Sequence, residues 1–238
     1  MLHARLVLGA DGAASKVRAC AGLDADSHDY GQRGLVAYVG TQCPHEDTAW
    51  QRFLPTGPLA FLPCADGRCS IVWSLPADEA QRLLDADEEP FRRELTRAFD
   101  ARLGEVVSVS ARAAFPLRRQ LASAQVAGRI VLAGDAAHVV HPLAGQGVNL
   151  GLRDVAALRA SWQQALARGS DFASPHRLAR WARTRRSENT LAAYSFETIN
   201  RAFSNDALLP TLLRGHALGL ANRLTPVTRA LWRRAAGL

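Results

Sequence analysis

Cysteine is scarce in this sequence, and the few cysteines form no recognisable metal or redox motif. Only four occur in 238 residues, at Cys20, Cys43, Cys64 and Cys69. None forms a CxxC pair, and no histidine pair completes a zinc-binding pattern. We therefore expect no metal site, and four small buried side chains in a reducing compartment.

Long hydrophobic runs and a leader segment are also lacking. No apolar stretch reaches the ~20 residues that a helix needs to cross a bilayer, and residues 1–5 lead straight into a short strand rather than a signal peptide. Hydrophobic residues make up 48% of the chain and charged residues 21%, which is typical of a soluble globular protein. These features predict a cytoplasmic protein of one large or two ordinary domains.

Lysine-rich or arginine-rich runs interleaved with aromatic residues are missing, although the net charge is +7 and almost all of the excess is arginine. Nucleic acid is therefore the weakest explanation of the charge. Two others stay open. The arginines can reflect a coding bias, or they can mark peripheral contact with an anionic membrane, such as the inner membrane.

The residues that carry chemistry are concentrated between Arg129 and Asp154. An apolar run at 129–133 reads as a buried strand, and helical spacing begins at Leu150. Between them lies an acidic turn, Gly134-Asp135, followed by a glycine-rich loop. A ligand can lie directly against glycine backbone, and a helix start stabilises an electron-rich group through its unpaired N–H groups. Asp135 is placed to accept hydrogen bonds from hydroxyls of the same ligand.

The loop carries a specific motif. From His141 to Asp154 it reads HPLAGQGVNLGLRD. This run resembles the signature of the ubiquinone-biosynthesis hydroxylases, a branch of the FAD-dependent aromatic hydroxylases related to para-hydroxybenzoate hydroxylase. The resemblance implies that Asp135 contacts the flavin ribityl chain and that Gly147, Val148 and Asn149 meet the isoalloxazine edge. The remaining cofactor-binding residues implied in this segment are Gly134, Pro142, Gly145 and Gln146.

A second fingerprint precedes the first in the order that the family requires. Val7 to Arg18 match an apolar run, Ala-Asp-Gly, two residues, Ser, one residue, an apolar residue and Arg. In the family this segment helps to hold the FAD pyrophosphate and is implicated in handling the nicotinamide donor. The resemblance thus adds Asp11, Gly12 and Arg18 to the cofactor-binding residues. Ser15 is expected to cap the helix that follows.

The family's N-terminal GxGxxG motif, which binds the ADP half of FAD, does not occur in this sequence. The resemblance therefore covers a C-terminal portion of the family's chain. Either the sequence is a fragment or a truncation, or another polypeptide supplies the first half. We expect the isolated chain to be inactive for this reason.

Residues 29–116 change to short, β-rich runs that predict a mostly antiparallel sheet. Candidate strands are 35–39, 49–54, 59–62, 70–74 and 106–111, with helices at 78–84 and 90–103. Asp66-Gly67 reads as a hairpin turn. Trp50, Phe61 and Trp73 are more often sheet core than pocket lining, and we expect core for at least two of them.

The expected fold is α/β (α+β). It comprises a partial FAD/NAD(P)-binding Rossmann-like domain from residues 1–28 and 117–170, an inserted substrate-binding β-sheet domain at 29–116, and C-terminal helices at 171–238 packed on the FAD domain. Leu178 and Trp181 begin the apolar stripe of these helices. Five nearby arginines lie largely off it, namely Arg177, Arg180, Arg183, Arg185 and Arg186. The C-terminal helices either pack with a solvated arginine face or provide a membrane-interfacial surface.

The resemblance implies an FAD-dependent monooxygenase that hydroxylates the aromatic ring of a polyprenylated phenol or quinol in ubiquinone biosynthesis, using NAD(P)H and O2. Its partners would be that substrate and other proteins of the same pathway. No catalytic acid or base is evident, and His138 and His141 are more often structural hydrogen-bonders. Two alternatives stay open: a non-catalytic scaffold that holds no flavin, and a related flavoenzyme such as a prenyl reductase or halogenase.

Overall fold

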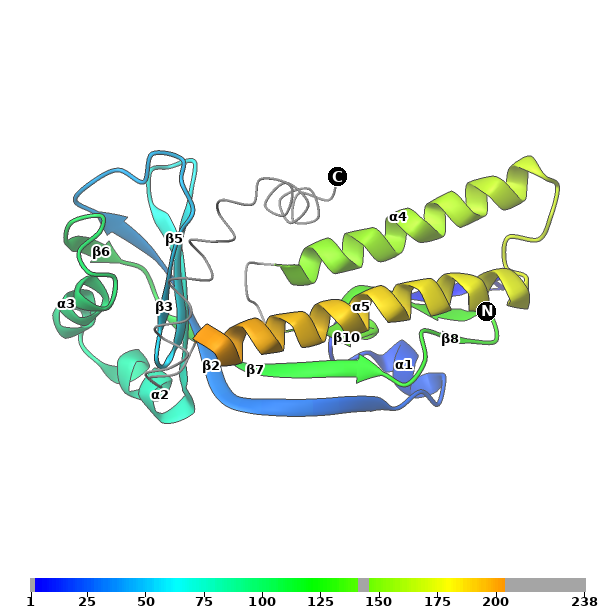
Figure 1. Ribbon diagram of the computed structural model, residues 1–238, viewed down its shortest axis with the longest axis horizontal. Coiled ribbons are helices and arrows are strands. Elements are labelled where there is room, and N and C mark those ends of the chain that lie inside the picture. The colour runs from blue at the N-terminus through cyan, green and yellow to red at the C-terminus, as the bar shows by residue number, and fades with distance from the viewer. Residues whose placement is uncertain (1–2, 141–145, 204–238) are drawn as a thin grey trace. The chain divides into compact units, whose positions relative to one another are not determined.

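The computed structural model describes residues 3–140 and 146–203 (Figure 1). The chain divides into two compact units. Of the described residues, the first unit holds 3–30, 118–140 and 146–197, and the second holds Gly31–Leu117 and 198–203. Two long strands, β2 (Ala25–Thr41) and β7 (Ala113–Ala122), pass from one unit to the other.

The first unit contains a small sheet in the order β1-β9-β8. Strand β1 (Val7–Gly9) pairs in parallel with β9 (Ile130–Leu132), and β8 (Val126–Ala127) pairs antiparallel with β9. Because β1 and β9 are parallel, the segments that follow them, residues 10–18 and the turn at Gly134, begin at the same edge of the sheet. Helix α1 (Lys16–Cys20) follows β1, and the single 3-10 turn η1 (Gly134–Ala136) follows β9.

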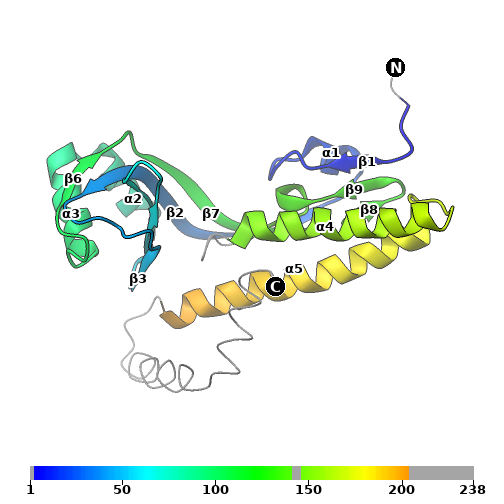
Figure 2. The same ribbon diagram turned by 90° about the horizontal axis from the view of Figure 1, so that it is seen from above.

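Two long helices pack against this sheet. Helices α4 (Gln146–Ala167) and α5 (Pro175–Phe203) lie side by side in Figures 1 and 2. Their contact is apolar: Leu158 of α4 packs with Leu178 and Trp181 of α5, and with Val131 of β9. This cluster explains the helical spacing of apolar residues in both segments. The last strand of this unit, β10 (His138–Val139), pairs antiparallel with β7.

The second unit is an antiparallel sheet covered by two short helices. Strands β2, β5 (Cys69–Pro76), β4 (Gly57–Pro63) and β3 (Trp50–Leu54) are neighbours in that order, and β6 (Val106–Val109) also pairs with β2. Helix α2 (Ala77–Asp85) and helix α3 (Glu88–Ala98) supply the other half of its core. Large buried side chains of this core include Leu35, Leu59, Phe61, Ile71, Trp73, Phe91 and Leu95.

Several expectations about this unit are confirmed. Phe61 and Trp73 are buried in the core, and Trp50 packs partly against it. Asp66-Gly67 forms the turn between β4 and β5, with Gly67 at a φ of 84° that glycine adopts without strain. The expected helix at 90–103 is too long. It ends at Ala98 because Asp100 and Ala101 take left-handed φ values of 59° and 47°.

The overall fold class, mixed α/β with a mostly antiparallel second sheet, is as expected. The expectation of four buried thiols is wrong. Cys69 is buried, and burial raises the pKa of its thiol, but Cys20 and Cys43 are exposed on a short helix and a loop. The helices expected within residues 204–238 lie outside the described residues.

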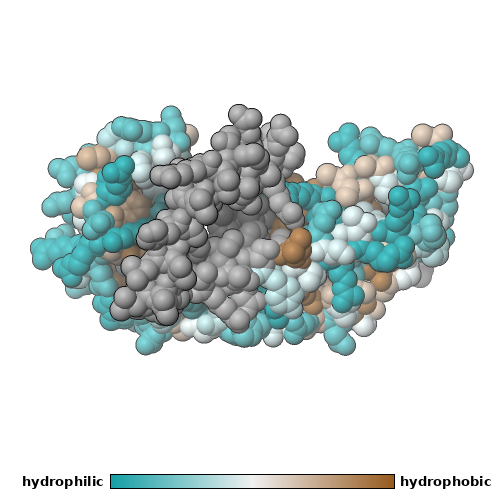
Figure 3. Space-filling model, viewed as in Figure 1, coloured by the Kyte–Doolittle hydropathy of each residue, from teal (hydrophilic) through white to brown (hydrophobic). Residues whose placement is uncertain are grey.

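On the face drawn in Figure 3, hydrophobic residues are scattered among hydrophilic ones. Within residues 3–140 and 146–203, no helix combines the length and the apolarity that crossing a bilayer requires.

Candidate cofactor site

Arg18 joins the two sequence fingerprints in space. Its guanidinium donates one hydrogen bond to the main-chain oxygen of Ala136 at 2.9 Å and another to that of Ala13 at 2.8 Å. Gln120 on β7 donates to the same Ala13 oxygen at 3.1 Å. Segments that are more than 100 residues apart in the sequence are thereby fixed side by side. That both segments bind the same cofactor stays a prediction.

The N-terminal fingerprint, Val7–Arg18, forms an ordered turn. The Asp11 carboxylate accepts hydrogen bonds from the Ser15 hydroxyl at 2.5 Å and from the Val17 amide at 3.1 Å. These bonds, that from Ser15 above all, hold the pKa of Asp11 below its ordinary value. Ser15 caps α1 by accepting from the Arg18 amide, as expected. Gly12 has a φ of 81° and open space where a Cβ would stand.

The acidic turn that precedes the glycine-rich fingerprint, His141–Asp154, packs tightly against α4. Gly134 has a φ of 59°, and its amide donates to the Asp154 carboxylate at 3.1 Å. A Cβ on Gly151 would stand 3.2 Å from the Gly134 Cα, which is closer than ordinary contact. The two glycines therefore let η1 rest directly on the helix backbone. Asp135, the next residue, is exposed beside this contact.

The first turn of α4 is open to a ligand. A Cβ on Gly147 would meet no atom within 4 Å. Val148 is 73% exposed, and Asn149 is exposed as well. An N-terminal helix turn carries unpaired N–H groups and a partial positive charge. Pro142 and Gly145 lie outside the described residues, as does the side chain of Gln146.

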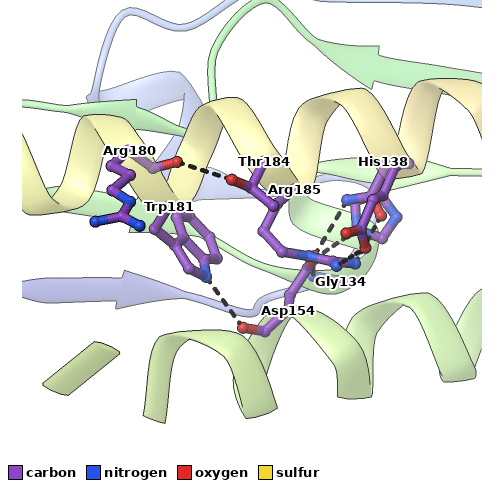
Figure 4. Close-up of polar contacts among 9 residues, drawn as sticks. Gly134, His138, Asp154, Arg180, Trp181, Thr184 and Arg185 are labelled. Carbon is purple, nitrogen blue, oxygen red and sulfur yellow. Dashed lines mark hydrogen bonds and ion pairs between the residues drawn. The ribbon is translucent and has the colours of Figure 1, made fainter. Parts of the chain in front are cut away.

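A buried polar network behind η1 holds it to both long helices (Figure 4). The carboxylate of Asp154, which is 0% exposed, accepts four hydrogen bonds. The donors are the Gly134 amide, His138 Nε2 at 2.6 Å, Arg185 Nε at 2.8 Å and Asn189 Nδ2 at 3.1 Å. Trp181 Nε1 adds a bond to the Asp154 main-chain oxygen at 3.3 Å. One carboxylate thus connects η1, β10, α4 and α5.

The charge state of Asp154 follows from two opposing effects. Burial disfavours its charged form, but the hydrogen bonds from His138, Arg185 and Asn189 outweigh burial and hold its pKa below the ordinary value. Because a carboxylate only accepts, His138 donates through Nε2. His138 is therefore a structural hydrogen-bonder, as expected, whereas His141 lies outside the described residues.

The network corrects one expectation about the arginines of α5. Arg185, expected largely on a solvated face, is only 3% exposed and bonds to Asp154, Glu188 and Asn189. The apolar stripe at Leu178 and Trp181 gave no sign of this role. One sequence feature could have revealed that Arg185 is buried. Arg185 and Asn189 are four residues apart, on the face of α5 that carries Trp181.

The geometry fits a flavin. The space beside Gly147 is one that a Cβ would fill, the adjoining helix turn suits an electron-rich ring, and the exposed Asp135 carboxylate can accept from hydroxyls. The comparison with protein families agrees. The profile described as "FAD binding domain" matches residues 1–192.

The chain belongs to the FAD-binding domain family. Its relatives within that family include the ubiquinone hydroxylase UbiL of Rhodospirillum rubrum, 40% identical over 99% of this chain and 55% of the relative. The 3-demethoxyubiquinol 3-hydroxylase of Escherichia coli is 37% identical over 100% of this chain and 61% of the relative. The expected resemblance to ubiquinone-biosynthesis hydroxylases is thereby confirmed. The chain spans little more than half the length of these relatives.

Solved structures of flavin enzymes share the fold. PqsL of Pseudomonas aeruginosa, a probable FAD-dependent monooxygenase, is 28% identical with a TM-score of 0.69, over 84% of this chain and 57% of that one. The p-nitrophenol 4-monooxygenase PnpA of Pseudomonas putida has a TM-score of 0.75 at 20% identity, over 95% of this chain and 57% of that one. This chain therefore has the fold that its two fingerprints predict.

Proposed function

We propose that this chain forms part of an FAD-dependent monooxygenase that hydroxylates the aromatic ring of a polyprenylated phenol or quinol in ubiquinone biosynthesis. NAD(P)H would be the electron donor and O2 the oxidant. One observation carries the proposal. The N-terminal fingerprint is joined through Arg18 to the turn that leads to the glycine-rich fingerprint, and the first turn of α4 has open space at Gly147. The names of the two hydroxylase relatives supply the substrate class.

In this proposal each segment has a separate task toward the cofactor. Asp135 accepts hydrogen bonds from the ribityl hydroxyls, and the first turn of α4, from Gly147 to Asn149, contacts the isoalloxazine edge. The N–H groups of that turn stabilise negative charge on the reduced ring. When bound, FAD supplies the redox and oxygen chemistry. Gly12 and Arg18 support the pyrophosphate, with Asp11 shaping their turn.

The second unit would cover the aromatic substrate. Its antiparallel sheet supports this assignment, since Phe61 and Trp73 build a rigid core behind the sheet surface. Neither of these two side chains is free to line a pocket, because each is almost completely buried. An apolar cover excludes water from the reacting groups. The same proposal includes two assignments from the sequence: residues 29–116 as the substrate-binding domain, and residues 171–238 as the C-terminal helices.

The test uses a complete enzyme, made by joining this chain to the part of the E. coli relative that lies outside the match. We expect substrate-dependent NAD(P)H oxidation that is coupled to O2 uptake and to a hydroxylated product. Oxidation without O2 uptake would point instead to a reductase. Protein that stays colourless after incubation with FAD would contradict the proposal and support the scaffold alternative.

A further inference from the structure

A basic groove lies between α4 and α5, and none of its lining residues belongs to the two flavin fingerprints. The cavity has a volume of about 640 Å³. Its wall on α4 includes Ser161 and Gln164, and its wall on α5 includes Arg180 and Thr184. Figures 1 and 2 both show the two helices running side by side along this region. The charged or titratable lining residues are Arg168, His176, Arg177, Arg180, Arg185 and Glu188.

Two of these charged groups neutralise each other. Arg185 is paired with the buried Asp154 and with Glu188, so it adds no net charge to the groove. Glu188 is the one carboxylate among the described lining residues, and this pairing uses it. Asp171, which lies in the loop between α4 and α5, forms ion pairs with Arg5 and Arg129.

Three arginines of the groove have no acidic counterpart among the described residues. Arg168 and Arg180 are exposed and form no ion pair within residues 3–140 and 146–203. Arg177 donates to neutral acceptors, the main-chain oxygen of Ser161 at 3.1 Å and the Ser170 hydroxyl at 3.2 Å. Its Nε is buried and has no partner in the described part of the chain. A buried donor without an acceptor is costly, and an incoming oxygen atom would satisfy it.

The arrangement of these three cations favours an anion with several oxygens. Like charges gathered in one cavity repel one another, and a bound anion removes that repulsion. Arginine presents its N–H groups in a planar fork that matches phosphate oxygens. Figure 4 shows Arg180 extending from α5 beside Trp181, which reaches to α4. Arg177 and His176 stand in the first turn of α5, where the helix dipole adds to the attraction.

We propose that this groove binds a phosphate-bearing ligand that carries at least two negative charges. The cavity volume falls within the ~300–1,000 Å³ of small-ligand sites, so it accommodates an organic phosphate and not only an inorganic ion. The shared chemistry is the phosphate group. Its source is either a soluble organic diphosphate or the headgroup of an anionic lipid. The proposal does not depend on the flavin site.

The test measures pyrophosphate binding to the 238-residue chain by isothermal titration. The variant R168Q/R180Q removes two exposed charges without touching the Arg177 hydrogen bonds. R183Q/R186Q is the matched control, because it removes two exposed charges from the same part of the fold but neither residue lines the groove. We expect the groove variant to weaken pyrophosphate binding about tenfold or more, and the control about twofold or less.

A second arm distinguishes the source of the phosphate. The same proteins are floated with vesicles of phosphatidylglycerol or phosphatidylcholine. Binding to phosphatidylglycerol that is lost in R168Q/R180Q and displaced by pyrophosphate assigns the groove to a lipid headgroup. If vesicle binding is equal in all three proteins or is not seen, while pyrophosphate binding is lost in R168Q/R180Q alone, the ligand is soluble. The proposal is overturned if pyrophosphate does not bind, or if both variants weaken it equally, which would reflect net charge alone.

Discussion

Replacing Asp154 by Ala is expected to destabilise the first unit strongly. The change removes the acceptor of four hydrogen bonds and leaves Arg185 with Glu188 as its remaining carboxylate partner. Breaking a buried ion pair by removing one partner costs about 3–5 kcal/mol. That cost lowers the ratio of folded to unfolded protein by roughly two to four orders of magnitude.

The assay is urea unfolding followed by near-ultraviolet circular dichroism, with Asp24→Ala as the control. Asp24 is exposed in the same unit, and its replacement should change the free energy of unfolding by less than about 0.5 kcal/mol. The double variant D154A/R185M should lose less than the sum of its two single variants, by about 0.5–3 kcal/mol. If D154A lies within the error of D24A, or if the two losses simply add, the network does not hold the unit together as described.

Three further outcomes follow from the same site. Gly151→Ala should push η1 away from α4 and cost about 1–3 kcal/mol of stability, because its Cβ would stand 3.2 Å from the Gly134 Cα. Thermal unfolding measures this loss, and an unchanged unfolding temperature would contradict it. Lowering the pH should remove the stability that charged Asp154 contributes. Because the folded pKa of Asp154 is depressed, this contribution is full above the ordinary value of 3.8 and is lost as the pH falls through the folded pKa. Acid unfolding that is the same in D154A as in the parent would argue against this. The isolated 238-residue chain should bind FAD only weakly, since it lacks a GxGxxG turn for the ADP phosphates, and micromolar binding by titration calorimetry would refute that expectation.

Much of the fold was predictable because periodicity reports burial directly. The strands of the second unit follow their apolar runs, and the hairpin at Asp66-Gly67 follows its turn chemistry. The end of α3 was not predictable, since Ala101 adopts left-handed backbone directly after Asp100, and alanine rarely takes that conformation. Tertiary contacts around Phe99, which stacks on Phe61 with ring centroids 3.9 Å apart, accompany that turn.

The candidate site was predictable where it depends on local motifs. The Ser15 cap and the open backbone at Gly147 are properties of short segments. The role of Asp154 was not, because its partners Arg185 and Asn189 lie 31 and 35 residues later on another helix. A charged residue within an apolar helix pattern reveals that a partner is needed, but its identity emerges only once α4 and α5 are packed together.

The most direct test of the flavin assignment is the flavin content of the complete enzyme, with and without Gly147→Val. In this chain the space beside Gly147 is empty to 4 Å, so valine should not disturb the protein itself. The enzyme is the fusion to the E. coli relative described above, and visible flavin absorbance is compared with protein concentration. We predict that the parent purifies with FAD and that Gly147→Val folds equally well but purifies without it. A Gly147→Val enzyme carrying a full complement of FAD would contradict the assignment of the α4 start as the flavin ring site.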